Sequence, residues 1–119
     1  MEKISIHGKE IARYFSTKYC GLISIRANGV TLIQYPDTDW EVLSYKREDA
    51  SLENWTKGKL EFVAELPEWK VGIKSLPSLD TIAEWMGDSI CETVTGEIIE
   101  PDGVGSDGAP SWLLALGLM

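Results

Sequence analysis

The chain has little of what disulfide and zinc frameworks need. It carries two cysteines, Cys20 and Cys91, and a single histidine, His7. Two widely spaced cysteines form no disulfide framework, and we interpret them as reduced thiols of the kind found in cytosolic proteins. Zinc motifs place cysteine and histidine ligands in close pairs, which this sequence does not contain. The composition therefore predicts no metal site of the zinc type.

Long apolar runs are also missing. A membrane span needs about 18 consecutive apolar residues, and no window of the sequence supplies them. The first seven residues contain no apolar run of the signal-peptide type. We therefore expect a cytoplasmic protein with no membrane partner. A chain of 119 residues with 44% apolar content is expected to build one core, so we predict a single domain over residues 1–119.

Familiar catalytic motifs are absent. The sequence has neither a Gly-x-Ser-x-Gly nucleophile elbow nor a glycine-rich phosphate loop. His7 is the only candidate for an imidazole base, and it would need Cys20 or Cys91 together with an orienting acid. We therefore predict no catalytic residues and no cofactor. A carboxylate pair acting as acid and base stays open, because acids are abundant.

Basic residues are missing from the last part of the chain. Residues 1–74 hold all 11 Lys and Arg together with 11 acids, whereas residues 75–119 hold acids only. The formal net charge of −8 therefore lies entirely after residue 74. Such a field repels nucleic acid and anionic lipid and attracts basic surfaces or cations. We expect a basic protein surface as the partner and no direct binding of nucleic acid.

Apolar spacing predicts both helices and strands. Helical spacing is found over residues 9–19 and most clearly over 79–91, where Ser78 is a suitable N-cap. The second of these helices has an apolar stripe, formed by Leu79, Ile82, Ala83, Met86 and Ile90. Alternating or β-rich runs predict strands over the ranges 3–7, 22–25, 30–35, 40–45, 60–66, 69–73 and 97–100.

The dipeptide Asn28-Gly29 gives the sharpest local prediction. Asn-Gly tolerates the positive φ angles of a type I′ turn, so the flanking runs are expected to form a tight hairpin. With a two-residue turn, Ile25 would face Leu32. Because strands and helices cluster rather than alternate, we predict an α+β fold. It would have a mostly antiparallel sheet of four to six strands with one or two helices packed on one face.

Four acids recur at every fourth position around the helix predicted over 79–91. They are Asp80, Glu84, Asp88 and Glu92. This spacing places them along one helix face, with Trp85 beside both the acids and the apolar stripe. Three interpretations stay open: a solvated face, a docking surface for a basic partner, and a divalent-cation site.

The end of the chain holds an acidic loop and an apolar tail. The loop over 101–110 lacks the ligand pattern of a calcium-binding EF-hand, because Val104 stands at a ligand position. Trp112 opens an apolar run over 112–116, which either packs on the sheet or is available to a partner. Because tryptophan often anchors interfaces, we keep Trp112 as a candidate partner-binding residue.

One part of the sequence resembles a known group. Its residues are Cys91-Glu92, Glu100-Pro101-Asp102-Gly103 and Pro110-Ser111-Trp112-Leu113. This order is similar to the C-terminal signature of short uncharacterised proteins of bacteria and their phages, and it covers the last quarter of the chain. The resemblance implies a bacterial or phage origin and no particular activity. It also implies that cysteine and histidine side chains of the relatives are replaced here at Glu97, Gly105 and Asp107.

These observations favour a non-catalytic protein-binding module. A bacterial or phage-encoded inhibitor that covers a nucleic-acid-binding surface is one form of such a module. Its predicted partner-binding residues are Asp80, Glu84, Trp85, Asp88, Glu92 and Trp112. One alternative is a small cation-dependent enzyme or metal-binding protein that uses His7 and the carboxylates of residues 97–107. Another is a structural assembly subunit that uses the tail beginning at Trp112. The sequence leaves the oligomeric state open.

Overall fold

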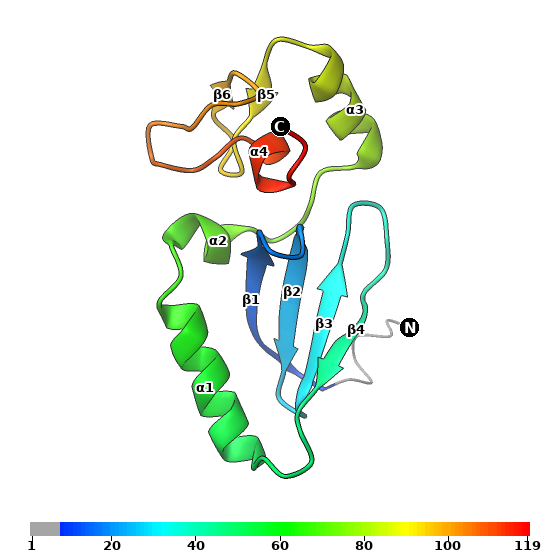
Figure 1. Ribbon diagram of the computed structural model, residues 1–119, viewed down its shortest axis with the longest axis vertical. Helices are drawn as coiled ribbons and strands as arrows, with labels where there is room; N and C mark the ends of the chain where they lie inside the picture. The colour runs from blue at the N-terminus through cyan, green and yellow to red at the C-terminus, as the bar shows by residue number, and fades with distance from the viewer. Residues whose placement is uncertain (1–7) are drawn as a thin grey trace.

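The computed structural model describes residues 8–119 and contains two antiparallel sheets (Figure 1). The larger sheet has the order β1-β2-β3-β4, with β1 (Glu10–Ser16), β2 (Gly21–Arg26), β3 (Val30–Gln34) and β4 (Glu41–Tyr45). The elements that follow are α1 (Leu52–Ala64), α2 (Glu68–Gly72), α3 (Leu79–Gly87), β5 (Cys91–Glu92), β6 (Ile98–Ile99) and α4 (Trp112–Ala115). The predicted α+β class is confirmed. The strand predicted over 3–7 and the candidate base His7 lie outside the described residues.

The hairpin predicted at Asn28-Gly29 is present between β2 and β3, but its register differs from the prediction. Ile25 pairs with Thr31, and Leu32 pairs with Ser24. Of the turn residues 27–29 only Gly29 has a positive φ, at 91°, and its N–H donates to the Arg26 carbonyl. A type I′ turn needs two positive φ angles, so three residues connect the strands instead of two. The extra residue places Ile25 and Leu32 on opposite faces of the sheet.

The range 9–19 contains the strand β1 (Glu10–Ser16) followed by a turn, and not the predicted helix. The strand pairs with β2 along its length, with Tyr14 opposite Ile23 and Phe15 opposite Leu22. Aromatic and β-branched side chains fit a pleated surface, and Phe15 becomes fully buried there. The stabilisation that this segment gains by pairing with β2 outweighs the local preference for a helix that its apolar spacing indicates.

The strands predicted over 60–66 and 69–73 are also wrong, because most of the first range belongs to α1 and most of the second to α2. The Ser51 side chain accepts a hydrogen bond from the Asn54 N–H and starts α1. Pro67 stands at the N-cap of α2, where its missing N–H costs nothing. On α1, Trp55 and Val63 are two turns apart and contact the buried residues of one sheet face. The apolar side chains that contact the sheet therefore recur with the 3.6-residue period of a helix, and this explains why the segment is helical.

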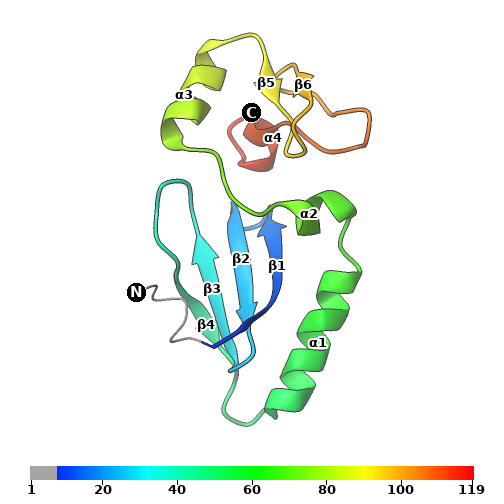
Figure 2. The same ribbon diagram turned by 180° about the vertical axis from the view of Figure 1, so that it is seen from behind.

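Two clusters of buried side chains form the core. The first lies between the sheet and α1 and contains Ile23, Ile25 and Ile33. The second joins the end of the sheet to the C-terminal elements; its buried members are Phe15, Leu22, Ile73, Ile82, Cys91, Trp112, Leu113, Ala115 and Leu116. Figure 2 shows the C-terminal elements beyond the end of the sheet rather than on its face. The radius of gyration of 15.6 Å exceeds the roughly 13.5 Å of a compact chain of this length, so the molecule is elongated.

Candidate functional site

Helix α3 carries only part of the predicted acidic row. Asp80 and Glu84 lie on the helix and are exposed. The helix ends at Gly87, and Asp88 has an extended backbone with φ −108° and ψ 166°. Glu92 belongs to β5, so a single helix face with four acids is not formed. All four carboxylates are nevertheless exposed to solvent.

The apolar stripe of α3 faces solvent over most of its length. Ile82 is buried and Trp85 is half-buried, and these two side chains attach the helix to the core. Leu79, Met86 and Ile90 are 56%, 58% and 53% exposed. Of the predicted apolar stripe only Ile82 is therefore buried, because a nine-residue helix at the end of the fold contacts the core along one edge. We call the exposed side chains Leu79, Asp80, Glu84, Met86, Asp88 and Ile90 the outer α3 surface.

The start of α3 is fixed by two caps. The Ser78 side chain accepts a hydrogen bond from the Thr81 N–H, which confirms the predicted N-cap. Asp37, in the loop between β3 and β4, accepts a second hydrogen bond from the Leu79 N–H at 2.8 Å. Asp37 has a positive φ of 61°, which aspartate tolerates better than most residues. The sequence contained no signal for this second cap, which joins positions 42 residues apart.

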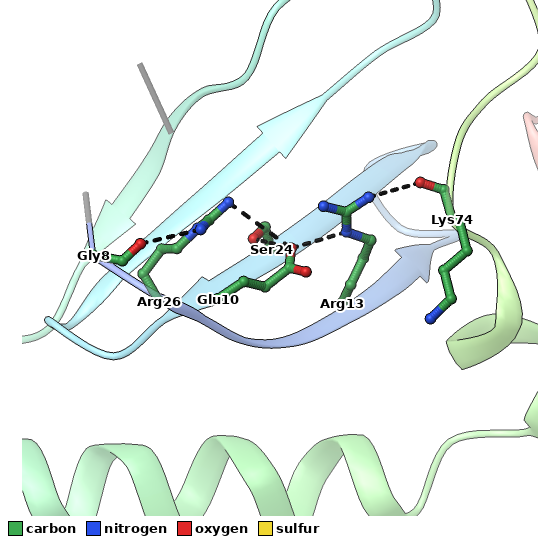
Figure 3. Close-up of polar contacts among 6 residues, drawn as sticks. All are labelled: Gly8, Glu10, Arg13, Ser24, Arg26 and Lys74. Atoms are coloured by element: carbon green, nitrogen blue, oxygen red, sulfur yellow. Dashed lines mark hydrogen bonds and ion pairs between the residues drawn. The ribbon is translucent and has the colours of Figure 1, made fainter. Parts of the chain in front are cut away.

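A polar cluster spans β1 and β2 (Figure 3). The Glu10 carboxylate accepts hydrogen bonds from Arg13 Nε at 2.9 Å and from the Ser24 hydroxyl, and Arg26 Nη2 lies 3.9 Å away. Burial by itself raises the pKa of Glu10, but the hydrogen bonds from Ser24 and Arg13 and the two guanidinium charges outweigh it and lower the pKa. Glu10 therefore stays ionised at neutral pH and acts as a structural anion rather than as an acid catalyst.

The same cluster connects the sheet to the rest of the molecule. Arg26 is 4% exposed, and its Nη1 donates to the Gly8 carbonyl at 3.1 Å. Arg13 Nη1 donates to the Lys74 carbonyl at 2.7 Å, and its guanidinium lies 5.1 Å from the centre of the Trp40 ring. Arg13 therefore joins β1 to the segment that leads into α3.

Of the four carboxylates over residues 97–107, those of Glu97 and Asp107 accept hydrogen bonds from nearby residues. Glu97 Oε1 accepts hydrogen bonds from the N–H and the hydroxyl of Ser106, at 3.1 and 2.9 Å. Asp107 accepts from the Thr95 hydroxyl at 2.7 Å and from the Ala109 N–H at 3.0 Å, and these bonds lower its pKa. Within residues 8–119, no group of three or more His, Cys, Asp and Glu side chains is placed to hold a metal ion.

The three positions singled out by the sequence resemblance lie together in this loop. A Cβ atom added to Gly105 would lie 3.0 Å from Glu97 Oε1 and 3.1 Å from Asp107 Oδ1. Gly105 therefore leaves room for the two carboxylates that close the loop.

Trp112 lies in the core and not on the surface. Its side chain is 7% exposed, and its ring meets the Phe15 ring edge-to-face at 5.8 Å. Ser111 starts α4 by accepting from the Leu114 N–H, and its hydroxyl donates to the Pro101 carbonyl. The tail that begins at Trp112 is therefore packed in the core and is not available to a partner. Cys91 is also buried, at 1% exposure, so solvent does not reach its thiol.

Two neighbouring hollows that the sequence did not indicate lie at the seam between α1 and β1. Two hollows of about 370 and 340 Å³ share Tyr14 and Phe62, whose rings meet edge-to-face at 5.6 Å. Burial, and secondarily the neighbouring Tyr19, raise the pKa of Tyr14. We call this feature the α1–β1 groove.

Comparison with protein-family models, curated proteins and solved structures finds no match to this chain. Over the described part of the chain, no helix combines the length and the apolar content needed to cross a membrane.

Proposed function

We propose that this chain is a non-catalytic protein-binding module that docks its outer α3 surface on a basic surface of a partner. The observation that carries the proposal is the exposure of α3. Ile82 and Trp85 hold the helix on the core, while Leu79 and Met86 stand in solvent beside Asp80 and Glu84. A bacterial or phage-encoded inhibitor that covers a nucleic-acid-binding surface is one form of such a module.

The two kinds of exposed side chain would contribute differently to binding. Burying apolar area is worth about 25 cal/mol per Å², so Leu79 and Met86 would supply affinity. The acids would steer a basic partner and set its orientation, because nothing after residue 74 carries a compensating positive side chain. The surface is therefore matched to a partner that is both basic and apolar.

The state of the other carboxylates also supports binding over catalysis. Glu10, Glu97 and Asp107 each accept hydrogen bonds from two or more donors of the chain itself. These hydrogen bonds hold the three side chains in place within the fold. The acids of the outer α3 surface, in contrast, are exposed.

Binding of a labelled peptide probe tests the proposal. The first probe is an amphipathic helical peptide of Lys and Leu, and the second is a polar peptide with the same charge. The α3 variant is Asp80→Asn, Glu84→Gln and Asp88→Asn. The matched control removes the same charge elsewhere through Glu48→Gln, Glu61→Gln and Glu65→Gln, all of which are exposed. Circular dichroism checks that both variants are folded.

We expect the amphipathic peptide to bind more tightly than the polar one. We also expect the α3 variant to lose about tenfold or more in affinity, while the control loses less, because loss of net charge alone affects both alike. Binding should weaken as the Debye length falls from about 10 Å at 0.1 M salt to about 3 Å at 1 M. Equal losses in the two variants, or binding that ignores salt, would contradict the proposal.

A further inference from the structure

The α1–β1 groove has a charge opposite to that of the outer α3 surface. Every charged residue among the described side chains that line its two hollows is a lysine: Lys59 in one, and Lys18 and Lys70 in the other. The molecule as a whole carries −8, so a groove whose charged lining residues are all lysines is a local exception. An anionic occupant would be attracted to it.

Aromatic rings accompany each of these lysines. Lys59 Nζ lies 5.7 Å from the centre of the Trp55 ring, and Lys18 Nζ lies 5.4 Å from that of Tyr19. Lys70 Nζ lies 5.6 Å from the Trp69 ring, which lies outside the two hollows. Phe62, at the middle of the groove, is 51% exposed. The groove therefore offers apolar area together with positive charge, the counterpart of a helix that bears acids and apolar side chains.

We propose that the α1–β1 groove binds the outer α3 surface of a second copy of this chain. This inference rests on the proposed function, because it names the basic partner of that same surface. An amphipathic helix laid into an apolar groove is a common mode of recognition. Asp80 and Glu84 would meet Lys18 and Lys70, while Leu79 and Met86 would cover Phe62.

The contact must form between molecules. Figures 1 and 2 show α1 toward one end of the long axis and α3 toward the other, with α2 between them. The caps from Ser78 and Asp37 and the core contacts of Ile82 and Trp85 hold α3 in place, so its outer surface does not turn onto the groove of its own chain. Contact between two different surfaces is heterologous, and each added copy leaves one surface of each kind available. The association should therefore grow with concentration, and the net charge of −8 on each copy should keep it weak.

Reciprocal charge reversal tests this contact. The groove variant carries Lys18→Glu and Lys70→Glu, and the α3 variant carries Asp80→Lys and Glu84→Lys. A second groove variant, Lys18→Gln and Lys70→Gln, covers the case in which the reversed groove fails to fold. Sedimentation equilibrium of the full chain at about 0.15 M salt, where the Debye length is about 8 Å, measures the average mass.

We expect the average mass of the unmodified chain to rise with concentration, and each variant alone to stay monomeric. A one-to-one mixture of the two reversed variants should associate again, because the acidic α3 of the groove variant meets the lysine groove of the α3 variant, and its acidic groove meets the basic α3. The inference would be overturned if the unmodified chain stayed monomeric up to about 1 mM, a concentration that corresponds to a binding free energy of about 4 kcal/mol. It would also be overturned if the mixture stayed monomeric. If the Lys and Leu peptide still binds α3 in that case, only the second-copy inference fails; if the peptide also ignores α3, the proposed function fails with it.

Discussion

The carboxylate of Asp37 accepts a hydrogen bond from the backbone N–H of Leu79 at 2.8 Å, and it thereby joins the β3–β4 loop to the first turn of α3. Together with the Ser78 cap, it satisfies two of the four N–H groups that a helix leaves free at its start. The negative charge also suits the positive end of the helix dipole. Asp37 therefore adds a contact from a distant loop to the core contacts of Ile82 and Trp85 that orient α3.

Replacement of Asp37 should loosen this connection. We expect Asp37→Ala to lower the free energy of unfolding by about 1–2 kcal/mol. The variant loses a helix cap, and alanine is strained at the positive φ of this position. Asp37→Asn should cost less, since its amide oxygen still accepts and asparagine tolerates the same backbone. Urea unfolding followed by tryptophan fluorescence measures both. Equal stabilities of the two variants would show that the hydrogen bond contributes nothing.

The ion pairs of Glu10 should make stability depend on pH. Its pKa is lowered in the folded protein, so its contribution is complete above the unfolded value of about 4.3 and is lost as pH falls through the folded value. We expect Glu10→Gln to cost about 1–3 kcal/mol at pH 7, because Arg13 and Arg26 lose a charged acceptor. The difference from the unmodified protein should shrink below about pH 4.

Urea unfolding at a series of pH values measures that difference. Glu41→Gln, which removes an exposed acid of β4, is the matched control. A Glu10→Gln difference that stays constant from pH 7 to pH 3 would contradict the assignment of Glu10 as a stabilising anion.

Trp112 should behave as a core residue. We expect Trp112→Ala to lower the free energy of unfolding by about 3–5 kcal/mol, since it empties the space beside Phe15. Trp112→Phe should retain more of the stability, because a smaller ring still contacts Phe15. Thermal unfolding measures both variants. A Trp112→Ala protein as stable as the original would show that this side chain serves a partner and not the core.

Glu97 should hold the loop over 97–107 closed. Replacement by alanine removes the acceptor for the N–H and the hydroxyl of Ser106. We expect faster hydrogen exchange at the Ser106 amide and no loss of the sheet, because the loop opens without the rest of the fold. Glu100→Ala, which changes an exposed acid of the same loop that makes no hydrogen bond to Ser106, should leave this exchange rate unchanged.

Local chemistry was enough for some elements. Asn28-Gly29 predicted the β2–β3 hairpin, the run over 40–45 predicted β4, and Ser78 predicted the start of α3. Each of these depends on backbone preferences or caps within a few residues. The helix predicted over 9–19 and the strands predicted over 60–66 and 69–73 were wrong, because short apolar segments fit both periods. Contacts with distant residues decided among them.

The candidate site divides in the same way. The spacing of Asp80 and Glu84 placed them correctly as exposed acids of α3. The exposure of Leu79 and Met86 was not predictable, because an apolar stripe is the usual sign of a buried face. The α1–β1 groove was not predictable either, since it exists only where α1 lies beside β1.

The sequence by itself determined the charge of this protein: all unbalanced acids follow residue 74, whatever the fold. It also determined the turn at Gly29 and the cap at Ser78, because backbone geometry and capping act over neighbouring residues. Only the tertiary structure decided that Trp112 is buried against Phe15, that Asp37 caps α3, and that the lysines line one groove. Those outcomes depend on which surfaces the folded chain brings together. Burial of apolar area drives that choice, and because the hydrophobic effect is non-directional, the sequence does not show which partners a residue will contact.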